Sequence, residues 1–333
     1  MFRRKEAWTV GICVLVLAMV LRLAGSAGVL PLENESLLSL LVYLQTGRVV
    51  RYPDAPVAEA PPPTAPVPTP PVQPPRGIQL TERDADAVQL NNFTDYEPDI
   101  KTFLCSALDW DLTGSQPTVL ILHTHATESY TQQPGEIYEE DSDYRTFNPS
   151  YNMLSIGEEL TRVLTAGGIH VLHDRTLHDY PSYSGSYNHA RQTIRAYLEA
   201  FPSIQMVIDL HRDALDFHTD PQLTTLADVG GQRSAQLMLV AGSDHNVSYT
   251  GWEANFALGV KLTAVLEKMY PGITRPIQLR QQRFNLDMSP GSILVEVGAN
   301  GNTHPEAITA VRALGAAILA MAQGVNLQNT PPF

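Results

Sequence analysis

The sequence predicts an α/β protein with a mixed central sheet flanked by helices. Short apolar runs alternate with longer segments of helical apolar spacing over residues 89–328, which is typical of a sheet covered on both faces. A hairpin expected around Gly230 and Gly231 makes the sheet mixed rather than purely parallel. The expected strands are 118–122, 169–172, 205–210, 236–242 and 292–298, and the expected helices are 152–168, 186–201, 251–270 and 305–324.

The first thirty residues predict a cytoplasmic stub and a single membrane-spanning anchor. An apolar run from residue 7 to 21 follows a basic start and continues past Arg22. A spanning helix needs about 20 residues, and an arginine at its end can reach the interface. The basic start would stay in the cytoplasm and place the rest of the chain outside the cell membrane. A cleaved signal peptide is the alternative, since residues 24–28 are small.

A juxtamembrane segment (31–52) and a proline-rich linker (53–88) precede the predicted extracytoplasmic domain (89–328). Residues 53–76 contain eleven prolines, which favours an extended polyproline spacer reaching about 70 Å. Such a spacer suits a partner held at a fixed distance from the membrane, for example a cell wall. A generic domain linker is the other interpretation.

Composition excludes several classes of function. A net charge of −13 argues against nucleic acid as a partner, because phosphates require basic neutralisation. The only cysteines are Cys13 and Cys105, so a thiolate zinc site is excluded and any metal ligands must be His and carboxylate. The sequence also has no GxSxG, no HExxH and no phosphate-binding glycine loop.

Three expected strands end in polar clusters. The first is followed by "HTHATES" (123–129), the third ends in "DLHRDA" (209–214), and the last carries "VEVGANGNT" (295–303). Because the carboxyl ends of strands line the ligand crevice of an open α/β sheet, these segments are expected to meet. The side chains expected to converge are His123, His125, Glu128, His211 and Glu296.

Two histidines and one carboxylate around an open position form a hydrolytic zinc arrangement. Bound zinc lowers the pKa of its water toward about 7, and a further carboxylate then moves protons. Glu296 lies between valines, where burial would raise its pKa. The alternative to a zinc site is a purely structural role for these residues: solvated or capping histidines, an Asp209–Arg212 pair, and Glu296 as an exposed edge residue.

Residues 177–187 form an aromatic loop that either binds substrate or packs on the surface. In the first case His178, Tyr180 and Tyr183 would face the crevice. Asn300, in the segment that carries Glu296, is a further substrate-binding candidate.

The four segments "HTHATESY", "HDYPSYSGSY", "DLHRDA" and "VEVGANGNT", in this order, resemble the stage II sporulation protein P family of endospore-forming bacteria. The similarity covers roughly residues 115–325, and the anchor and linker fit it. The resemblance implies a fold like that of the zinc-dependent N-acetylmuramoyl-L-alanine amidases. It also implies cleavage of the amide between N-acetylmuramic acid and L-alanine, and of peptide cross-links. The implied role is septal wall thinning and engulfment beside a lytic transglycosylase, stage II sporulation protein D.

The resemblance assigns the first zinc ligand to His125 or His123, the second to His211, and the catalytic carboxylate to Glu296. Arg212 would stabilise the developing oxyanion or bind a stem-peptide carboxylate. With His125 as the first ligand, His123 would be a ligand itself or a supporting partner.

The amidases place a ligand glutamate at the start of their first long helix, where this chain has Asn152. Glu128 is the expected substitute, since residues three apart, as His125 and Glu128 are, can converge on one ion. This spacing also resembles the zinc carboxypeptidases. The alternatives to an amidase are therefore a zinc peptidase acting on stem peptides and a non-catalytic wall-binding scaffold.

Overall fold

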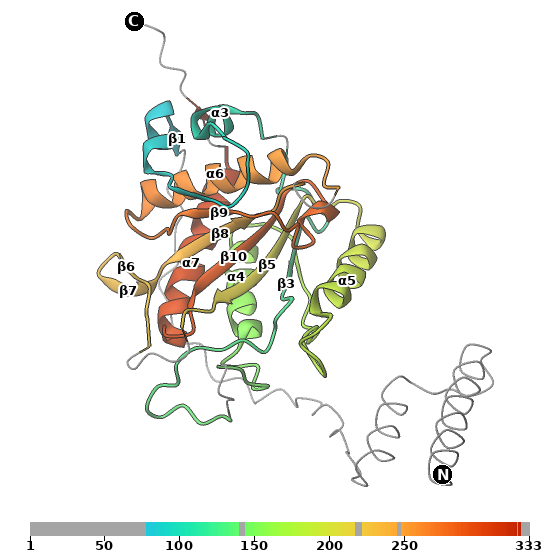
Figure 1. Cartoon of the computed structure of the whole chain (residues 1–333), viewed down its shortest axis with the longest axis vertical. Helices are drawn as coiled ribbons and strands as arrows, with labels where there is room; N and C mark the ends of the chain where they lie inside the picture. Colours follow the sequence, from blue (N-terminus) through green and yellow to red (C-terminus); the bar gives the residue numbers. More distant parts are fainter. Residues whose placement is uncertain are drawn as a thin grey trace, which may run out of the picture. The chain divides into compact units, whose positions relative to one another are not determined.

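A seven-stranded mixed sheet with the strand order β2-β9-β8-β10-β5-β3-β4 forms the centre of the fold (Figure 1). The computed structural model describes residues 78–108, 110–139, 144–216, 222–244 and 248–324, and the backbone of 326–327. The strands of this sheet are β2 (Leu90–Asn92), β3 (Val119–Leu122), β4 (Val171–His173), β5 (Met206–Asp213), β8 (Leu237–Ala241), β9 (Ile277–Leu279) and β10 (Ser292–Ala299).

The helices and the smaller elements surround this sheet. A two-residue pair joins β1 (Gln79–Leu80) to β11 (Asn326–Leu327), and β6 (Leu226–Val229) forms a hairpin with β7 (Gln232–Ala235). The four long predicted helices, the five predicted strands and the hairpin are confirmed. The helices are α3 (Ile100–Cys105), α4 (Met153–Ala166), α5 (Ser186–Ala200), α6 (Trp252–Met269) and α7 (His304–Ala322), with short 3-10 helices η1 (Glu82–Ala87) and η2 (Leu286–Met288).

Strand direction places the polar segments at one edge of the sheet. β3 and β10 both run parallel to β5, so the carboxyl ends of these three strands lie together. β8 runs antiparallel to β10, which confirms the predicted mixed sheet. The segments that begin at His123, Asp209 and Val295 therefore meet, as parallel pairing requires.

The alternation of side chains along β3 and β5 divides the core between the two faces of the sheet. Odd-numbered β3 residues and even-numbered β5 residues pack with α4, and the opposite set packs with α5. Each buried aliphatic side chain contributes about 1.5–3 kcal/mol relative to an exposed one. The first face includes Val119, Ile121, Met206, Ile208, Ile156 and Leu160, and the second includes Leu120, Leu122, Val207, Ala190 and Ile194.

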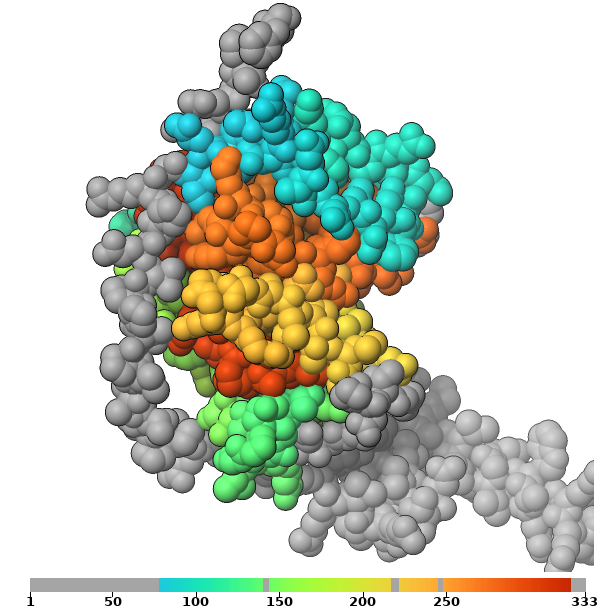
Figure 2. Space-filling model, turned by 90° about the vertical axis from the view of Figure 1, so that its left-hand side faces the viewer, coloured from blue at the N-terminus to red at the C-terminus, as the bar shows by residue number. Residues whose placement is uncertain are grey.

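Ordered elements begin within the range predicted as linker. β1 and η1 precede residue 89, and Ile78, Leu80, Ala85 and Val88 are buried in the main core. These elements are only two and six residues long, too short to show a periodic pattern in the sequence. Figure 2 shows this N-terminal part, in blue, directly against the orange segment that includes α6, and Lys268 of α6 pairs with Asp84 at 2.9 Å.

Helix α7 is the one helix in the described part of the chain that is long and apolar enough to suit a membrane span. Because 72% of that stretch is buried within the domain, it is a core helix here. The predicted anchor (1–30), the juxtamembrane segment and the proline-rich residues 53–76 lie outside the described residues.

Candidate active site

His123 and His125 follow β3 but separate onto different sides. The alternation that directs Val119 and Ile121 toward α4 does the same for His123. Its Nδ1–H donates to the carbonyl of Leu210 at 3.2 Å, and its Nε2 accepts from His173 Nε2 at 2.9 Å, a tautomer assigned from these partners. Both ring nitrogens of His123 therefore have hydrogen-bond partners within the protein, which fits a supporting residue better than a metal ligand.

His125 lies at the start of the turn that leads to Glu128. The Glu128 N–H donates to the His125 carbonyl at 3.2 Å, which closes the turn. The two imidazoles of His125 and His211 are 5.2 Å apart between centroids and nearly perpendicular. Burial, followed by the charge of His211, lowers the pKa of His125 to about 4. Its Nδ1 is buried and has no hydrogen-bond partner among the described residues.

Glu128 is the buried carboxylate that joins the histidines to two arginines. Its Oε2 lies 3.6 Å from His211 Nδ1 and accepts from the Arg212 N–H at 3.3 Å, while its Oε1 accepts from Arg145 at 3.3 Å. Burial alone would raise the pKa of Glu128. The Arg212 guanidinium and His211 outweigh burial and hold that pKa well below its usual range, so Glu128 is ionised.

Asp209 and His211 project on the same side of β5, because they are two residues apart. The Asp209 carboxylate accepts from Thr124 N–H at 2.8 Å and from Thr124 Oγ1 at 2.6 Å, which ties β5 to the turn after β3. His211 Nε2 is 3.1 Å from Asp209 Oδ1, although its N–H is not aligned for a hydrogen bond. Against the effect of burial, Asp209 and Glu128 raise the pKa of His211 well above its usual range.

The suggested Asp209–Arg212 pair is wrong, because Arg212 lies on the other side of β5. Alternation along the strand turns its guanidinium toward Glu128 at 3.8 Å, while Asp209 faces Thr124 and His211.

Glu296 sits directly beside His211 across the β5–β10 pairing, so both side chains lie on the same side of the sheet. The interpretation of Glu296 as an edge residue is wrong, since β10 runs between β8 and β5 in the interior of the sheet. Part of the side chain reaches the surface, but Oε2 is enclosed and has no partner among the described residues. Burial raises the pKa of Glu296 to about 8, with His211 opposing and Glu128 adding to the rise.

Arg212 is only 2% exposed, and its guanidinium is used inside the protein. Nε donates to the Ser129 carbonyl at 3.0 Å and Nη2 donates to the Tyr144 carbonyl at 3.2 Å. These contacts favour holding Glu128 over reaching substrate.

The side chains of Asn300 and His178, two candidates for substrate binding, also make hydrogen bonds within the protein. Asn300 accepts from the Leu215 N–H at 2.8 Å and donates to Gln222 at 2.8 Å. His178 bonds to the His123 carbonyl at 2.9 Å and to Thr193 Oγ1 at 3.0 Å. Both are buried and hold loops in place.

Among the aromatic candidates, Tyr183 contacts the cluster and Tyr180 does not. Tyr183 is 59% exposed and stacks on His125 with centroids 4.4 Å apart. The Arg145 guanidinium lies over the Tyr183 ring at 4.8 Å. Tyr180 instead packs edge-on against Phe147 at 5.1 Å. Tyr183 is therefore the loop residue placed to meet a ligand.

Three residues that sequence reasoning missed complete the site. Asp179 accepts from Thr127 Oγ1 at 2.6 Å and from Arg145 Nη1 at 2.9 Å, so Arg145 joins Asp179 to Glu128. Tyr187 lies against both His125 and His211. The chain gives no local signal for Arg145, whose position depends on an isolated bridge to Glu128, whereas Tyr187 closes the quoted "HDYPSYSGSY" segment.

Asn152, the residue at the start of the first long helix, has a structural role. Its side chain accepts from the Leu154 N–H as the cap of α4 and donates to the Thr146 carbonyl at 3.0 Å. A capping side chain of this kind stabilises a helix by about 1 kcal/mol.

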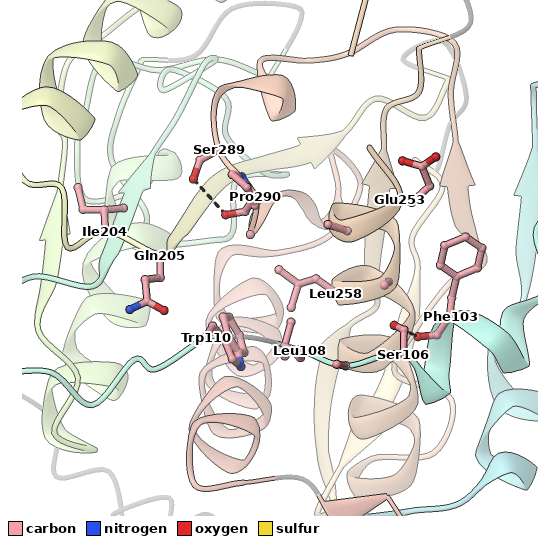
Figure 3. A pocket seen from close by; sticks show the side chains of 14 residues that line it. Phe103, Ser106, Leu108, Trp110, Ile204, Gln205, Glu253, Leu258, Ser289 and Pro290 are labelled. Carbon is pink, nitrogen blue, oxygen red and sulfur yellow. Dashed lines mark hydrogen bonds between the residues drawn. The ribbon is translucent and has the colours of Figure 1, made fainter. Parts of the chain in front are cut away.

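A separate cavity of about 650 Å³ lies at the opposite edge of the sheet, where Gln205 and Gly291 precede β5 and β10. Figure 3 shows Trp110, Leu108 and Leu258 lining it. Because ligands of open α/β sheets bind at the carboxyl ends of strands, the cluster around His211 is the better candidate active site.

The cluster has the donor types that zinc requires. His125 offers a buried nitrogen without a partner, and His211 Nδ1 faces the ionised Glu128. Asp209 can support His211 from its other nitrogen, as carboxylates commonly support ligand histidines. Within the described residues no three His, Cys, Asp or Glu side chains are already positioned to hold one ion. The residues fit zinc in kind, and binding would require side chains to move closer together.

The family assignment follows from a match over most of the chain. A family model described as Stage II sporulation protein P (SpoIIP) matches residues 71–319. The chain belongs to this family. The Stage II sporulation protein P of Bacillus subtilis (strain 168) is 27% identical over 207 residues, which are 58% of this chain and 48% of that protein. The chain thus matches about half the length of this curated relative, and the resemblance seen in the sequence is confirmed.

Solved structures with some likeness to the chain include several amidases. The CwlD amidase from Clostridioides difficile, solved in complex with the GerS lipoprotein, is 13% identical, with 61% of this chain and 95% of that chain covered and a TM-score of 0.38. An N-acetylmuramoyl-L-alanine amidase from Clostridium difficile 630 is also 13% identical, with coverages of 63% and 99% and a TM-score of 0.39. These values are too low to assign an activity.

Proposed function

We propose that the protein is a membrane-anchored peptidoglycan hydrolase that cleaves the amide between N-acetylmuramic acid and L-alanine with zinc-activated water. One observation carries the proposal: His125, Glu128, His211 and Glu296 gather at the carboxyl edge of the sheet, although they lie more than 170 residues apart along the chain. Family membership supports a role in sporulation, in septal wall degradation and engulfment.

In this proposal His125, Glu128 and His211 hold the zinc ion, and Asp209 and Arg212 hold these ligands in place. The ion, when bound, would lower the pKa of a water molecule and polarise the scissile carbonyl. His125 is suited to ligation because its low pKa keeps the imidazole neutral. His211 carries a proton when no ion is bound, so zinc binding would release it.

Glu296 is the proposed general base and acid. It would take a proton from the attacking water and deliver it to the amide nitrogen as the carbon–nitrogen bond breaks. A carboxyl with a pKa of about 8 can exchange protons near neutral pH, whereas an exposed glutamate is a weak base there. The enclosed Oε2 beside His211 places this group next to the proposed ligands.

The remaining parts of the proposal concern location and partners. The basic and apolar N-terminus would anchor the chain in the cell membrane, with this domain outside and the proline-rich linker spanning to the wall. A stage II sporulation protein D-like transglycosylase would act beside it on the glycan strands. A zinc peptidase on stem peptides remains the second candidate, favoured by the His125–Glu128 spacing that resembles carboxypeptidases.

The proposal is tested by measuring how fast the wild type and the variant His211→Ala release muropeptides from purified peptidoglycan. We expect a folded protein that loses bound zinc and at least about 10³-fold of its activity, because a proposed ligand and its charge are removed. The control His170→Ala removes an exposed histidine distant from the cluster and should retain full activity. Full hydrolysis by folded His211→Ala would contradict the metal mechanism.

A further inference from the structure

We propose that the hydroxyl of Tyr187 donates a hydrogen bond to the oxygen of the scissile carbonyl as that oxygen becomes negatively charged. This inference rests on the proposed amide hydrolysis. It adds a residue that touches the reacting atoms and belongs neither to the proposed ligands nor to the proposed base.

Tyr187 is held against both proposed ligand histidines. Its ring meets His125 edge-on at 5.5 Å and lies nearly parallel to His211 at 6.4 Å, with an interplanar angle of 14°. Phe284 packs on it at 5.9 Å. The residue lies in the first turn of α5, just after Gly185, whose φ of 99° lets the loop turn into the helix. The ring is therefore positioned by a helix and by three other rings.

The surroundings of Tyr187 are those of the candidate active site. Its ring contacts His125 and His211, and the charges of His211, Asp209, Glu296 and Glu128 act on its phenol. A tyrosine hydroxyl is protonated at neutral pH and can donate a hydrogen bond. No described residue accepts a hydrogen bond from it, so this donor remains available for a ligand.

The other strong donors of the site are engaged within the protein. Arg212 donates to the carbonyls of Ser129 and Tyr144, and Arg145 donates to Glu128 and Asp179. Redirecting either guanidinium would leave a buried carboxylate or carbonyl without its partner, which costs about 1–3 kcal/mol or more. Tyr187 can donate without breaking a contact of this kind.

The chemistry requires only a hydrogen bond from Tyr187. When water attacks the carbonyl carbon, the carbonyl oxygen gains negative charge and the hydrogen bond to it strengthens. The charge returns to the carbon–oxygen bond as the amide nitrogen leaves with a proton from Glu296, and the phenol keeps its own proton. Donors placed in this way contribute roughly 10²–10³-fold to the rate in other enzymes.

The experiment compares Tyr187→Phe with Tyr197→Phe in the full chain with bound zinc. Tyr197 is on the same helix, and its hydroxyl contacts Asp174 at 3.4 Å, away from the cluster. We expect kcat on a soluble muramoyl peptide to fall roughly 10²-fold for Tyr187→Phe, with KM, zinc content and the melting temperature near those of the wild type. Tyr197→Phe should retain the wild-type kcat.

The outcomes separate this inference from the proposed function. A wild-type kcat in Tyr187→Phe would overturn the inference while leaving a chelator-sensitive hydrolase intact. A Tyr187→Phe protein that loses zinc would also overturn it, because the residue would then position the ligands. If the wild-type protein itself fails to cleave the amide, the proposed function fails first.

Discussion

Gly157 in α4 offers a quantitative test of the packing of His123 and His173 beneath the candidate active site. A Cβ added there would lie 2.5 Å from both His123 Nε2 and His173 Nε2. These two buried imidazoles are hydrogen-bonded to each other, and His123 also holds the carbonyl that precedes His211. The new methyl group must therefore displace rings that have little space to move. Overpacking of this kind costs about 1–3 kcal/mol, which exceeds the gain of about 1 kcal/mol from replacing a helical glycine with alanine.

We expect Gly157→Ala to lower the free energy of unfolding by up to about 2 kcal/mol in urea titrations, the overpacking cost less the gain in helix propensity. Gly259→Ala in α6 is the matched control, because its Cβ would meet only Leu239 Cδ2 at an ordinary 3.6 Å. That variant should gain up to about 1 kcal/mol from helix propensity alone. If Gly157→Ala were as stable as Gly259→Ala, the packing of His123 and His173 against α4 would be wrong.

Three further predictions concern the charged groups of the site. In the metal-free folded protein, Glu296 keeps its proton up to a pKa of about 8, whereas in the unfolded chain it releases the proton near the usual pKa of 4.5. The free energy of unfolding therefore falls as pH rises between these two values. This loss reaches up to about 5 kcal/mol at pH 8, and Glu296→Gln should remove it. If urea titrations gave the wild type and Glu296→Gln the same pH dependence of stability, the burial of a protonated Glu296 would be wrong. Arg145→Met should lower the free energy of unfolding by about 3 kcal/mol in the same assay, because Glu128 and Asp179 lose their shared ion-pair partner. An unchanged urea midpoint would argue against the Glu128–Arg145–Asp179 ion pairs. Asp209→Asn should weaken zinc retention roughly 10–100-fold in a chelator competition, and an unchanged affinity would exclude its support of His211.

The main elements of the fold could be predicted because their patterns are long and periodic. The apolar spacing of α4, α5, α6 and α7 and the buried runs of β3, β5, β8 and β10 identify them without tertiary information. β9 and β2 have three residues each, and β1 has two, so their patterns are too short to recognise. They form through contacts with residues distant in the chain, such as the pairing of β2 with β9.

The candidate site was predictable where it depends on strand ends and unpredictable where it depends on loops. Parallel pairing brings His211 and Glu296 into register, and the order of polar segments along the chain already indicates this. His123 keeps the alternation of β3, whereas His125 lies in the turn that follows, so their difference depends on knowing that β3 ends at Leu122. The joining of Glu128 to Asp179 through Arg145 depends on a bridge between two loops that leaves no periodic signal.

The contacts of Arg212, His178 and Asn300 show a limit of reasoning from motifs. Each lies in a segment shared with the family, yet each side chain is buried and bonded to the backbone or to loop residues. A sequence motif identifies residues that the site requires without separating those that touch substrate from those that hold the site together. Burial and hydrogen-bond partners make that separation.

The proposed zinc mechanism is best tested by mass spectrometry of peptidoglycan digested by the zinc-loaded protein, with and without a chelator. We expect stem peptides with free L-alanine amino termini and glycan strands with free lactyl groups. These products should disappear with the chelator and return when zinc is added. Cuts only within stem peptides would favour the peptidase, and products that persist at full yield in the chelator would contradict the zinc site at His125, Glu128 and His211.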